Sequence, residues 1–336
     1  MSESREKIYR KSIIAARTRN VNMIILILIL ALITVVAAVI VTGVTGSASG
    51  ILARFYAIEA VNKIDIYISQ DLSLIQKVAH SKVVTEWFAD EKNQEKKLAA
   101  FNEIMDFADL IQNAELYIGI HESLNEFSLL SGSTLADFVS NDTLDLSNPV
   151  NDWYYECINS PHDYNLKIDL DKFSNSWRLW VNHKVMLNKK ILGVFCSGLE
   201  IDTVLNDVFS QYDNEDVKGF VIDNRGRIKM DSANYNIHVE ENDIFIHMAS
   251  PDPVFALTIN SFLEKIDGYF GSRTQPDVIK LSKGPYGYAS IAPISYSDWS
   301  VVTLFNSRSL FSAIHFLPLL LVMLAAFIFY TVTNSI

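Results

Sequence analysis

The chain has 336 residues, 49% of them hydrophobic and 20% charged, which is enough for one or two domains with buried cores. Its formal net charge of −11 argues against nucleic acid as a partner. Two cysteines in this length exclude a disulfide-built scaffold and a cysteine-rich zinc module. The mean hydropathy of +0.17 is high for a soluble protein, because the apolar residues are concentrated in two runs.

Both runs have the length and composition of membrane spans. Residues 23–44 contain no charged side chain. A helix of that length reaches roughly 33 Å, which crosses a hydrocarbon core of about 30 Å. Residues 311–332 form a second uncharged run, and Pro318 stands in its first turns, where a proline removes little helical hydrogen bonding. We therefore expect two transmembrane helices.

The basic residues indicate the orientation. Residues 1–22 contain six basic and two acidic side chains, a charge of +4, so the remainder carries −15. The basic end should stay in the cytoplasm, which places residues 46–310 outside the cell membrane. A cleaved signal peptide ending near Ser47-Ala48-Ser49 is the alternative, but the apolar run is longer than the usual 7–15 residues of such a signal.

The outer segment begins with a long helix. Over residues 47–81 apolar side chains recur every three or four positions, and a second helix is expected at 94–112. Asp152 is expected to be the N-cap of a short helix that runs through Ile158. Asp202 is expected to cap a helix that runs to about residue 212. The expected strands of this first module are residues 115–120, 126–130, 164–171, 177–186 and 191–199, the last two joined as a hairpin by Asn188-Lys189-Lys190.

A smaller, strand-rich module starts near Val217. Its first two strands flank the hairpin turn Asn224-Arg225-Gly226. Residues 254–262 fit a helix or a strand. Further strands are expected at residues 278–281, 286–293 and 299–305.

Four stretches in this order resemble the double Cache (dCache) sensors of bacterial transmembrane receptors. They are Trp153-Tyr154, Gly193-Val194, the segment from Gly219 to Ile228, and the segment from Tyr286 to Val302. The resemblance implies an α+β fold: a long N-terminal helix and two tandem PAS-like modules between two transmembrane helices. It also implies a homodimer that senses a small molecule in the membrane-distal module and drives a chemoreceptor, histidine kinase or diguanylate cyclase output.

The expected organisation follows directly. It comprises a cytoplasmic basic tail (1–22), a first span (23–45), the long helix with the membrane-distal module (46–216), the membrane-proximal module (217–310), a second span (311–332) and a cytoplasmic segment (333–336). Ser335-Ile336 resembles the start of a HAMP linker, which favours a truncated receptor; a two-span protein without an output domain is the alternative.

The binding site departs from the amino-acid-binding members of the family. Those members place an Arg two residues before the Trp-Tyr pair, where this chain has Asn151. They place an Asp near the end of the strand that begins with Gly-Val, which by spacing falls at Gly198. Both charged anchors are absent, so an α-amino acid is not the first expectation.

The alternation of polar and apolar residues predicts a different pocket. Aromatic walls would face carboxylate acceptors, with cationic, aromatic and amide groups beneath, which suits a polar or cationic ligand. The predicted residues are Trp153, Tyr154, Asp169, Asp171, Arg178, Trp180 and Asn182. The competing interpretations are plain core for the Trp-Tyr pair, turn-capping or solvated carboxylates for the two Asp residues, and a surface ion pair for Arg178.

Other chemistry has little support in the sequence. The seven histidines show no metal-ligand spacing, and no nucleophile or nucleotide motif is present, so we expect no catalytic residue, metal or cofactor. Cys157 and Cys196 are either buried thiols or an oxidised pair. A membrane-anchored assembly protein and, less favoured, an extracytoplasmic enzyme remain the alternatives to a sensor.

Overall fold

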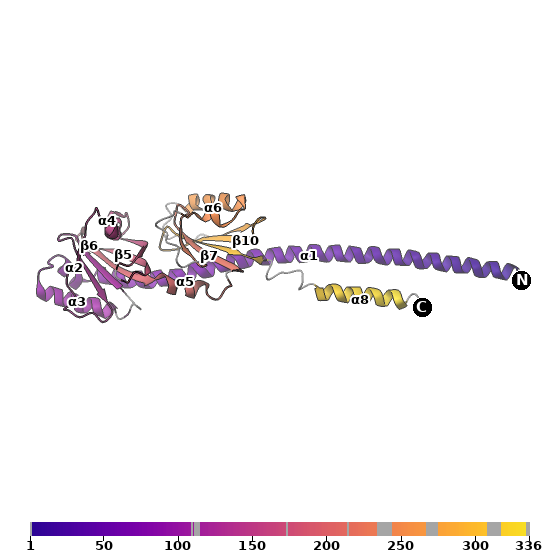
Figure 1. Cartoon of the computed structure of the whole chain (residues 1–336), viewed down its shortest axis with the longest axis horizontal. Helices are drawn as coiled ribbons and strands as arrows, with labels where there is room; N and C mark the ends of the chain where they lie inside the picture. Colours follow the sequence, from indigo (N-terminus) through magenta and orange to yellow (C-terminus); the bar gives the residue numbers. More distant parts are fainter. Residues whose placement is uncertain are drawn as a thin grey trace. The chain divides into compact units, whose positions relative to one another are not determined.

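The computed structural model describes residues 2–108, 110, 115–172, 174–213, 215–233, 244–266, 275–307 and 317–333. The chain divides into two units (Figure 1). One consists of the two chain ends, residues 1–52 and 307–336, and the other, residues 53–306, holds both β-sheets.

The unit of chain ends contains the apolar helices. Helix α1 (Ser2–Ala79) is continuous, and its most apolar stretch has a mean hydropathy of 3.5 and contains no buried side chain among those described. Among the described residues it is the one helix long and apolar enough to cross a membrane. Helix α8 (Leu317–Thr333) carries a shorter apolar stretch, Leu321–Tyr330. Residues 311–316 of the predicted second span lie outside the described residues, so that span stays a prediction.

The first sheet has six antiparallel strands in the order β3-β2-β1-β6-β5-β4. Helices α2 (Lys82–Phe88), α3 (Gln94–Ala108) and the end of α1 pack on one face. Helix α4 (Asp152–Asn159), preceded by a 3-10 turn at Pro149–Asn151, packs on the other face. The strands are β1 (Glu115–Ile120), β2 (Asn125–Leu130), β3 (Asp142–Thr143), β4 (Tyr164–Leu170), β5 (Trp177–Leu187) and β6 (Lys190–Glu200).

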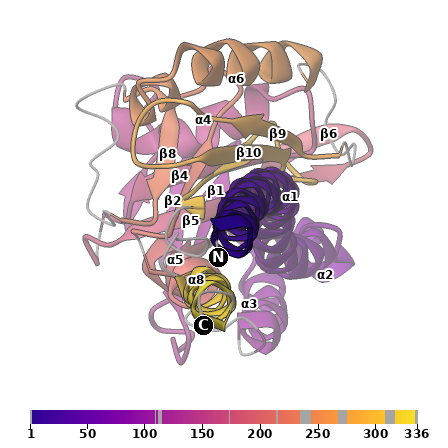
Figure 2. The ribbon, with the colours of Figure 1, turned by 90° about the vertical axis from the view of Figure 1, so that its right-hand side faces the viewer.

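The second sheet has five antiparallel strands in the order β8-β7-β11-β10-β9. Helices α1 and α5 (Ile201–Phe209) pack on one face, and α6 (Pro253–Ile266) covers the other (Figure 2). The strands are β7 (Val217–Ile222), β8 (Ile228–Asp231), β9 (Asp277–Lys280), β10 (Tyr288–Pro293) and β11 (Ser300–Phe305). Residues 254–262, for which the sequence allowed either a helix or a strand, lie in α6 and are helical.

Two predicted helix caps are wrong by one or two residues. Asn151 is the N-cap of α4, and Asp152 is its first residue, because the preceding 3-10 turn already directs the chain into the helix. Glu200 is the N-cap of α5, and Asp202 lies in the first turn. There its negative charge still favours the positive end of the helix dipole.

The predicted hairpin of β5 and β6 in the first module is confirmed. Asn188 and Lys189, with φ of 52° and 65°, form the two-residue turn between β5 and β6, as a type I′ hairpin requires. Along β4 and β5, Asp169 pairs with Arg178 and Lys167 with Trp180. This register places the polar residues of the two strands beside one another under α4.

Candidate functional site

A small cavity lies between α4 and the first sheet. Its volume is about 30 Å³, enough for a water molecule but too small for an organic ligand unless side chains move. Strands β1, β4, β5 and β6 and the start of α4 contribute to its wall. The main lining side chains are Tyr117, Trp153, Asp169, Asp171, Lys172 and Trp180.

Three aromatic rings form the apolar part of this wall. Tyr117 meets Trp180 edge to face, with ring centroids 5.2 Å apart, and lies 6.2 Å from Trp153. All three side chains are buried. Aromatic faces carry partial negative charge, so a box of this composition favours a cation over an anion.

Asp171 is fixed at the base of the cavity. Its Oδ2 accepts a hydrogen bond of 2.7 Å from the Tyr117 hydroxyl, and its Oδ1 accepts from the backbone N–H and the hydroxyl of Ser174. Burial by itself would raise the pKa of this carboxyl, but the hydrogen bonds outweigh burial and lower the pKa to about 2. Asp171 is therefore a permanent negative charge.

Asp169 is the more available carboxylate. Its side chain is 20% exposed, and its Oδ2 lies 3.4 Å from the Nζ of Lys167. Lys167 also contacts the carboxylate of Glu156 on α4, at 3.6 Å. Asp169 and Glu156 thus share one lysine, but Asp169 lines the cavity whereas Glu156 lines a separate cleft.

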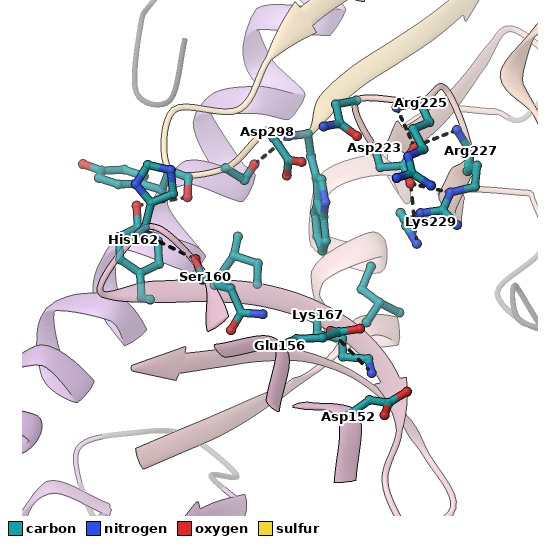
Figure 3. Close-up of a pocket in the computed structure, with 18 of the residues that line it drawn as sticks. Asp152, Glu156, Ser160, His162, Lys167, Asp223, Arg225, Arg227, Lys229 and Asp298 are labelled. Atoms are coloured by element: carbon teal, nitrogen blue, oxygen red, sulfur yellow. Dashed lines mark hydrogen bonds and ion pairs between the residues drawn. The ribbon is translucent and has the colours of Figure 1, made fainter. Parts of the chain in front are cut away.

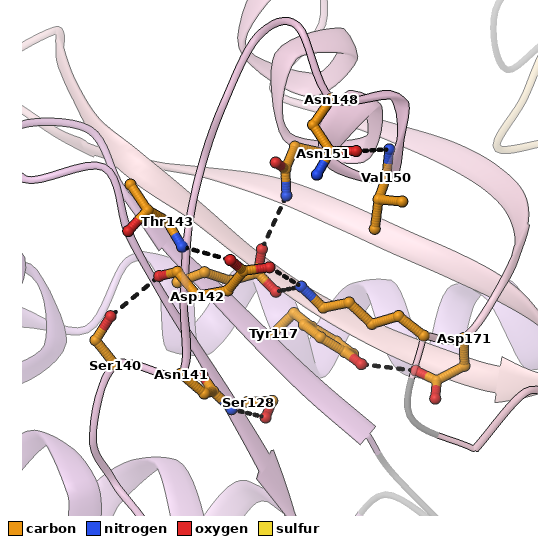
Figure 4. A network of polar contacts seen from close by, with 12 residues as sticks. Tyr117, Ser128, Ser140, Asn141, Asp142, Thr143, Asn148, Val150, Asn151 and Asp171 are labelled. Atoms are coloured by element: carbon orange, nitrogen blue, oxygen red, sulfur yellow. Dashed lines mark hydrogen bonds and ion pairs between the residues drawn. The ribbon is translucent and has the colours of Figure 1, made fainter.

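Lys172 connects the cavity to a buried acidic residue. Its ammonium forms an ion pair with Glu126, lies 3.1 Å from the Oδ2 of Asp142, and sits 5.6 Å from the ring centroid of Tyr117. Glu126 is 1% exposed and also accepts a hydrogen bond of 3.2 Å from the Asn151 amide (Figure 4). Burial raises the pKa of Glu126 despite the opposing charge of Lys172.

Four of the seven predicted residues come together around the cavity. These are Trp153, Asp169, Asp171 and Trp180, and the other three lie elsewhere. Tyr154 is fully buried, and its hydroxyl lies 2.9 Å from His121 Nδ1. Asn182 is also fully buried, and its side-chain amide has no hydrogen-bond partner among the described residues.

The third, Arg178, belongs to a buried ion pair. Its Nε lies 3.0 Å from the Glu115 carboxylate, and its Nη1 donates to the Gly198 carbonyl at 3.1 Å. Burial first, and then the neighbouring Asp171, raise the pKa of Glu115 to about 7, although Arg178 acts in the opposite direction. The surface ion pair that competed with a ligand role for Arg178 is in fact a buried one.

The two positions where amino-acid sensors carry charged anchors are occupied differently here. Asn151 is fully buried. Its side-chain N–H donates to the Glu126 carboxylate, and its Oδ1 accepts from the backbone N–H of Asp145. A Cβ at Gly198 would lie 2.4 Å from the Trp180 ring, so the indole fills the space that an Asp side chain would need. Neither position offers a charge to a ligand.

A larger cleft of about 1060 Å³ lies between the two sheet modules of the same unit (Figure 3). Asp152 and Glu156 line one wall, and Arg225, Arg227 and Lys229 line the other. Many of its charges are already paired within a wall: Asp223 lies 2.7 Å from Arg227 Nε and 3.7 Å from Lys229 Nζ. The cleft therefore presents both signs of charge without a clear preference.

Sequence reasoning missed Tyr117, Lys172 and Glu126. The one available signal was Glu126, the only charged residue of strand β2, because a carboxylate that becomes buried in a strand requires a partner. Nothing local indicated that Lys172, in the connection after β4, would reach it.

The remaining reactive groups offer no chemistry at this site. Cys157 and Cys196 are free and buried, and burial raises the pKa of Cys157 to about 12 and the pKa of Cys196 well above its usual value. Such thiols are protonated and poor nucleophiles. In the described part of the chain, no cluster of three or more His, Cys, Asp or Glu side chains is arranged to hold a metal ion.

Comparison with known proteins gives matches in structure alone. No family model and no curated protein match the sequence. The ligand-binding domain of the Campylobacter jejuni chemoreceptor Tlp3, in complex with 4-methylisoleucine, matches with a TM-score of 0.52 at 11% identity, over 80% of this chain and 94% of that one. That of the Pseudomonas fluorescens chemoreceptor CtaA, with L-leucine, matches with a TM-score of 0.51 at 13% identity, over 79% and 98%.

A third match is the ligand-binding domain of the Pseudomonas aeruginosa amino-acid chemoreceptor PctB with L-Gln. Its TM-score is 0.50 at 12% identity, over 78% of this chain and 93% of that one. The chain shares the fold of these ligand-binding domains, the double Cache fold. The predicted double Cache fold, with its long N-terminal helix and two α+β modules, is thereby confirmed.

Proposed function

We propose that this double Cache chain is the extracytoplasmic sensing input of a membrane receptor, and that the pocket under α4 binds a small ligand carrying an ammonium or similar cation. The observation that carries the proposal is the cavity itself. Three aromatic rings, the carboxylates of Asp169 and Asp171 and the side chain of Lys172 surround one small space in the first module. Net negative charge next to aromatic faces selects for a cation.

The three structural matches, each in complex with an amino acid, support a sensing role for this fold. In this chain Asn151 and Gly198, at the two positions where the family resemblance implied charged anchors, supply no charge for a carboxylate or an amine. We therefore propose a primary or quaternary amine without a required α-carboxylate. The two-pass topology, the homodimer and the downstream output belong to the same proposal.

Transmission would use α1, which carries core residues of both modules and continues into the apolar segment. A ligand that widens the pocket shifts the packing of the first sheet against this helix. Such a change biases a two-state equilibrium only by the difference in affinity of the ligand for the two states.

A matched pair of variants tests the pocket. Amines, amino acids and carboxylates are screened by thermal shift against the full chain in lipid nanodiscs, and the best compound is titrated against Asp169→Asn and Glu156→Gln. Both variants remove a carboxylate that contacts Lys167. We expect Asp169→Asn to weaken binding of an amine at least 10-fold and Glu156→Gln to leave it within twofold. Equal losses, or hits confined to carboxylates, would contradict the proposal.

A further inference from the structure

The Glu126 carboxylate is a deeply buried charge next to the cavity. It is 1% exposed, and leaving such a group without a cation costs several kcal/mol. Lys172 supplies that cation from the connection between β4 and β5, with 19% of its side chain exposed. Asp142, on β3, completes a cradle of two carboxylates around one ammonium.

Lys172 also forms part of the cavity wall. Its ammonium lies over the Tyr117 ring, and Tyr117 in turn bonds Asp171 at the base of the cavity. The acidic cradle, the aromatic box and the cavity are thus neighbours, and the Lys172 side chain stands between them. The cavity of about 30 Å³ therefore adjoins the Lys172 ammonium.

We propose that the Glu126–Asp142 cradle is the ammonium subsite of the pocket and that Lys172 occupies it in the ligand-free protein as an internal substitute for the ligand. This inference rests on the proposed function and names the group that a ligand must replace. A ligand brings its own ammonium to Glu126, and the displaced Lys172 side chain leaves room for the rest of the ligand.

Competition with an internal lysine makes the site selective. A neutral or anionic compound cannot take over the charge of Lys172, so Lys172 stays and the cavity remains closed to it. A cation can bind to Glu126 and Asp142, but it competes with the tethered Lys172 ammonium. Its concentration must therefore be high enough to compete with the effective concentration of that ammonium. Lys172 is thus a specificity-determining residue that sets a threshold concentration for the ligand.

Chemical rescue tests the subsite without knowledge of the natural ligand. Lys172→Met keeps the apolar stem of the side chain and removes its charge. Methylammonium chloride should raise the Tm of the full-length Lys172→Met protein by roughly 3 to 6 °C at ten times its Kd, more than sodium chloride at equal ionic strength. The wild type should show no such difference between the two salts. The double variant Lys172→Met/Glu126→Gln, which has neither charge, should also show the same Tm in methylammonium chloride and in sodium chloride.

Each result decides the question. If Lys172→Met folds only when methylammonium is present, the subsite is supported. If the double variant folds while Lys172→Met folds in neither salt, or if methylammonium acts no better than sodium, the cradle is closed to free cations and the inference is overturned. Rescue without any hit in the amine screen would retain the subsite and reject the sensing role. Conversely, an amine whose binding depends on Asp169, without rescue of Lys172→Met by methylammonium, would retain the sensing role and reject the subsite.

Discussion

Asp71 is a carboxylate of α1 buried between that helix and β6. It is 5% exposed, and Ser197 donates a hydrogen bond of 3.1 Å to it. Burial raises its pKa from 3.8 to about 6, although the Ser197 hydrogen bond acts in the opposite direction. The folded protein therefore holds this proton more tightly than the unfolded chain does.

The sign of the pH effect follows from that difference. The favourable contribution of protonated Asp71 to the free energy of unfolding is fully present below about pH 4, and it is lost as the pH rises through about 6. Asp71→Asn should match the wild type at pH 4 and exceed its unfolding free energy at pH 8 by roughly 3 kcal/mol, from 1.36 kcal/mol per pKa unit. Denaturant titrations at both pH values measure this. Asp106→Asn, at an exposed position on α3, controls for the loss of one charge. A uniform gain at both pH values would contradict the argument.

At the scale of elements, the helices and strands with a strong pattern were predictable. The three-to-four spacing predicted α1 to within two residues of its end at Ala79, and the β5–β6 hairpin followed from a short polar turn between alternating strands. Short elements were not predictable. Helix α2 has seven residues and strand β3 has two, too few for a period to show.

The candidate site was predictable only as far as strand faces determine it. Alternation on β4 and β5 located Asp169 and Trp180, and the short helix located Trp153. Tyr154, Arg178 and Asn182 do not line the cavity, and the cause is common to them: each side chain takes a place in the core that depends on residues distant in sequence. Tyr154 lies against Gly119, where a Cβ would come within 2.6 Å of its ring, and Arg178 meets Glu115 across the sheet.

At the scale of the whole molecule, the receptor proposal depends on which side of the membrane each part lies. The two native thiols are buried, so introduced cysteines can be labelled over a low background. Leu257 on α6 is 71% exposed, and Tyr9 near the N-terminus is 67% exposed. In intact cells, an impermeant maleimide should label Leu257→Cys but not Tyr9→Cys, and permeabilised cells should label both. Labelling of Tyr9→Cys alone in intact cells would reverse the topology and reject an external sensor.

Where a ligand binds is the point on which the sensing account depends most. Hydrogen–deuterium exchange of the full chain, with and without the best amine from the screen, measures it directly. We predict slower exchange in residues 149–159 and in β4, which enclose the cavity, and unchanged exchange in the hairpin of β7 and β8. Protection confined to that hairpin, on the wall of the larger cleft, would contradict the account.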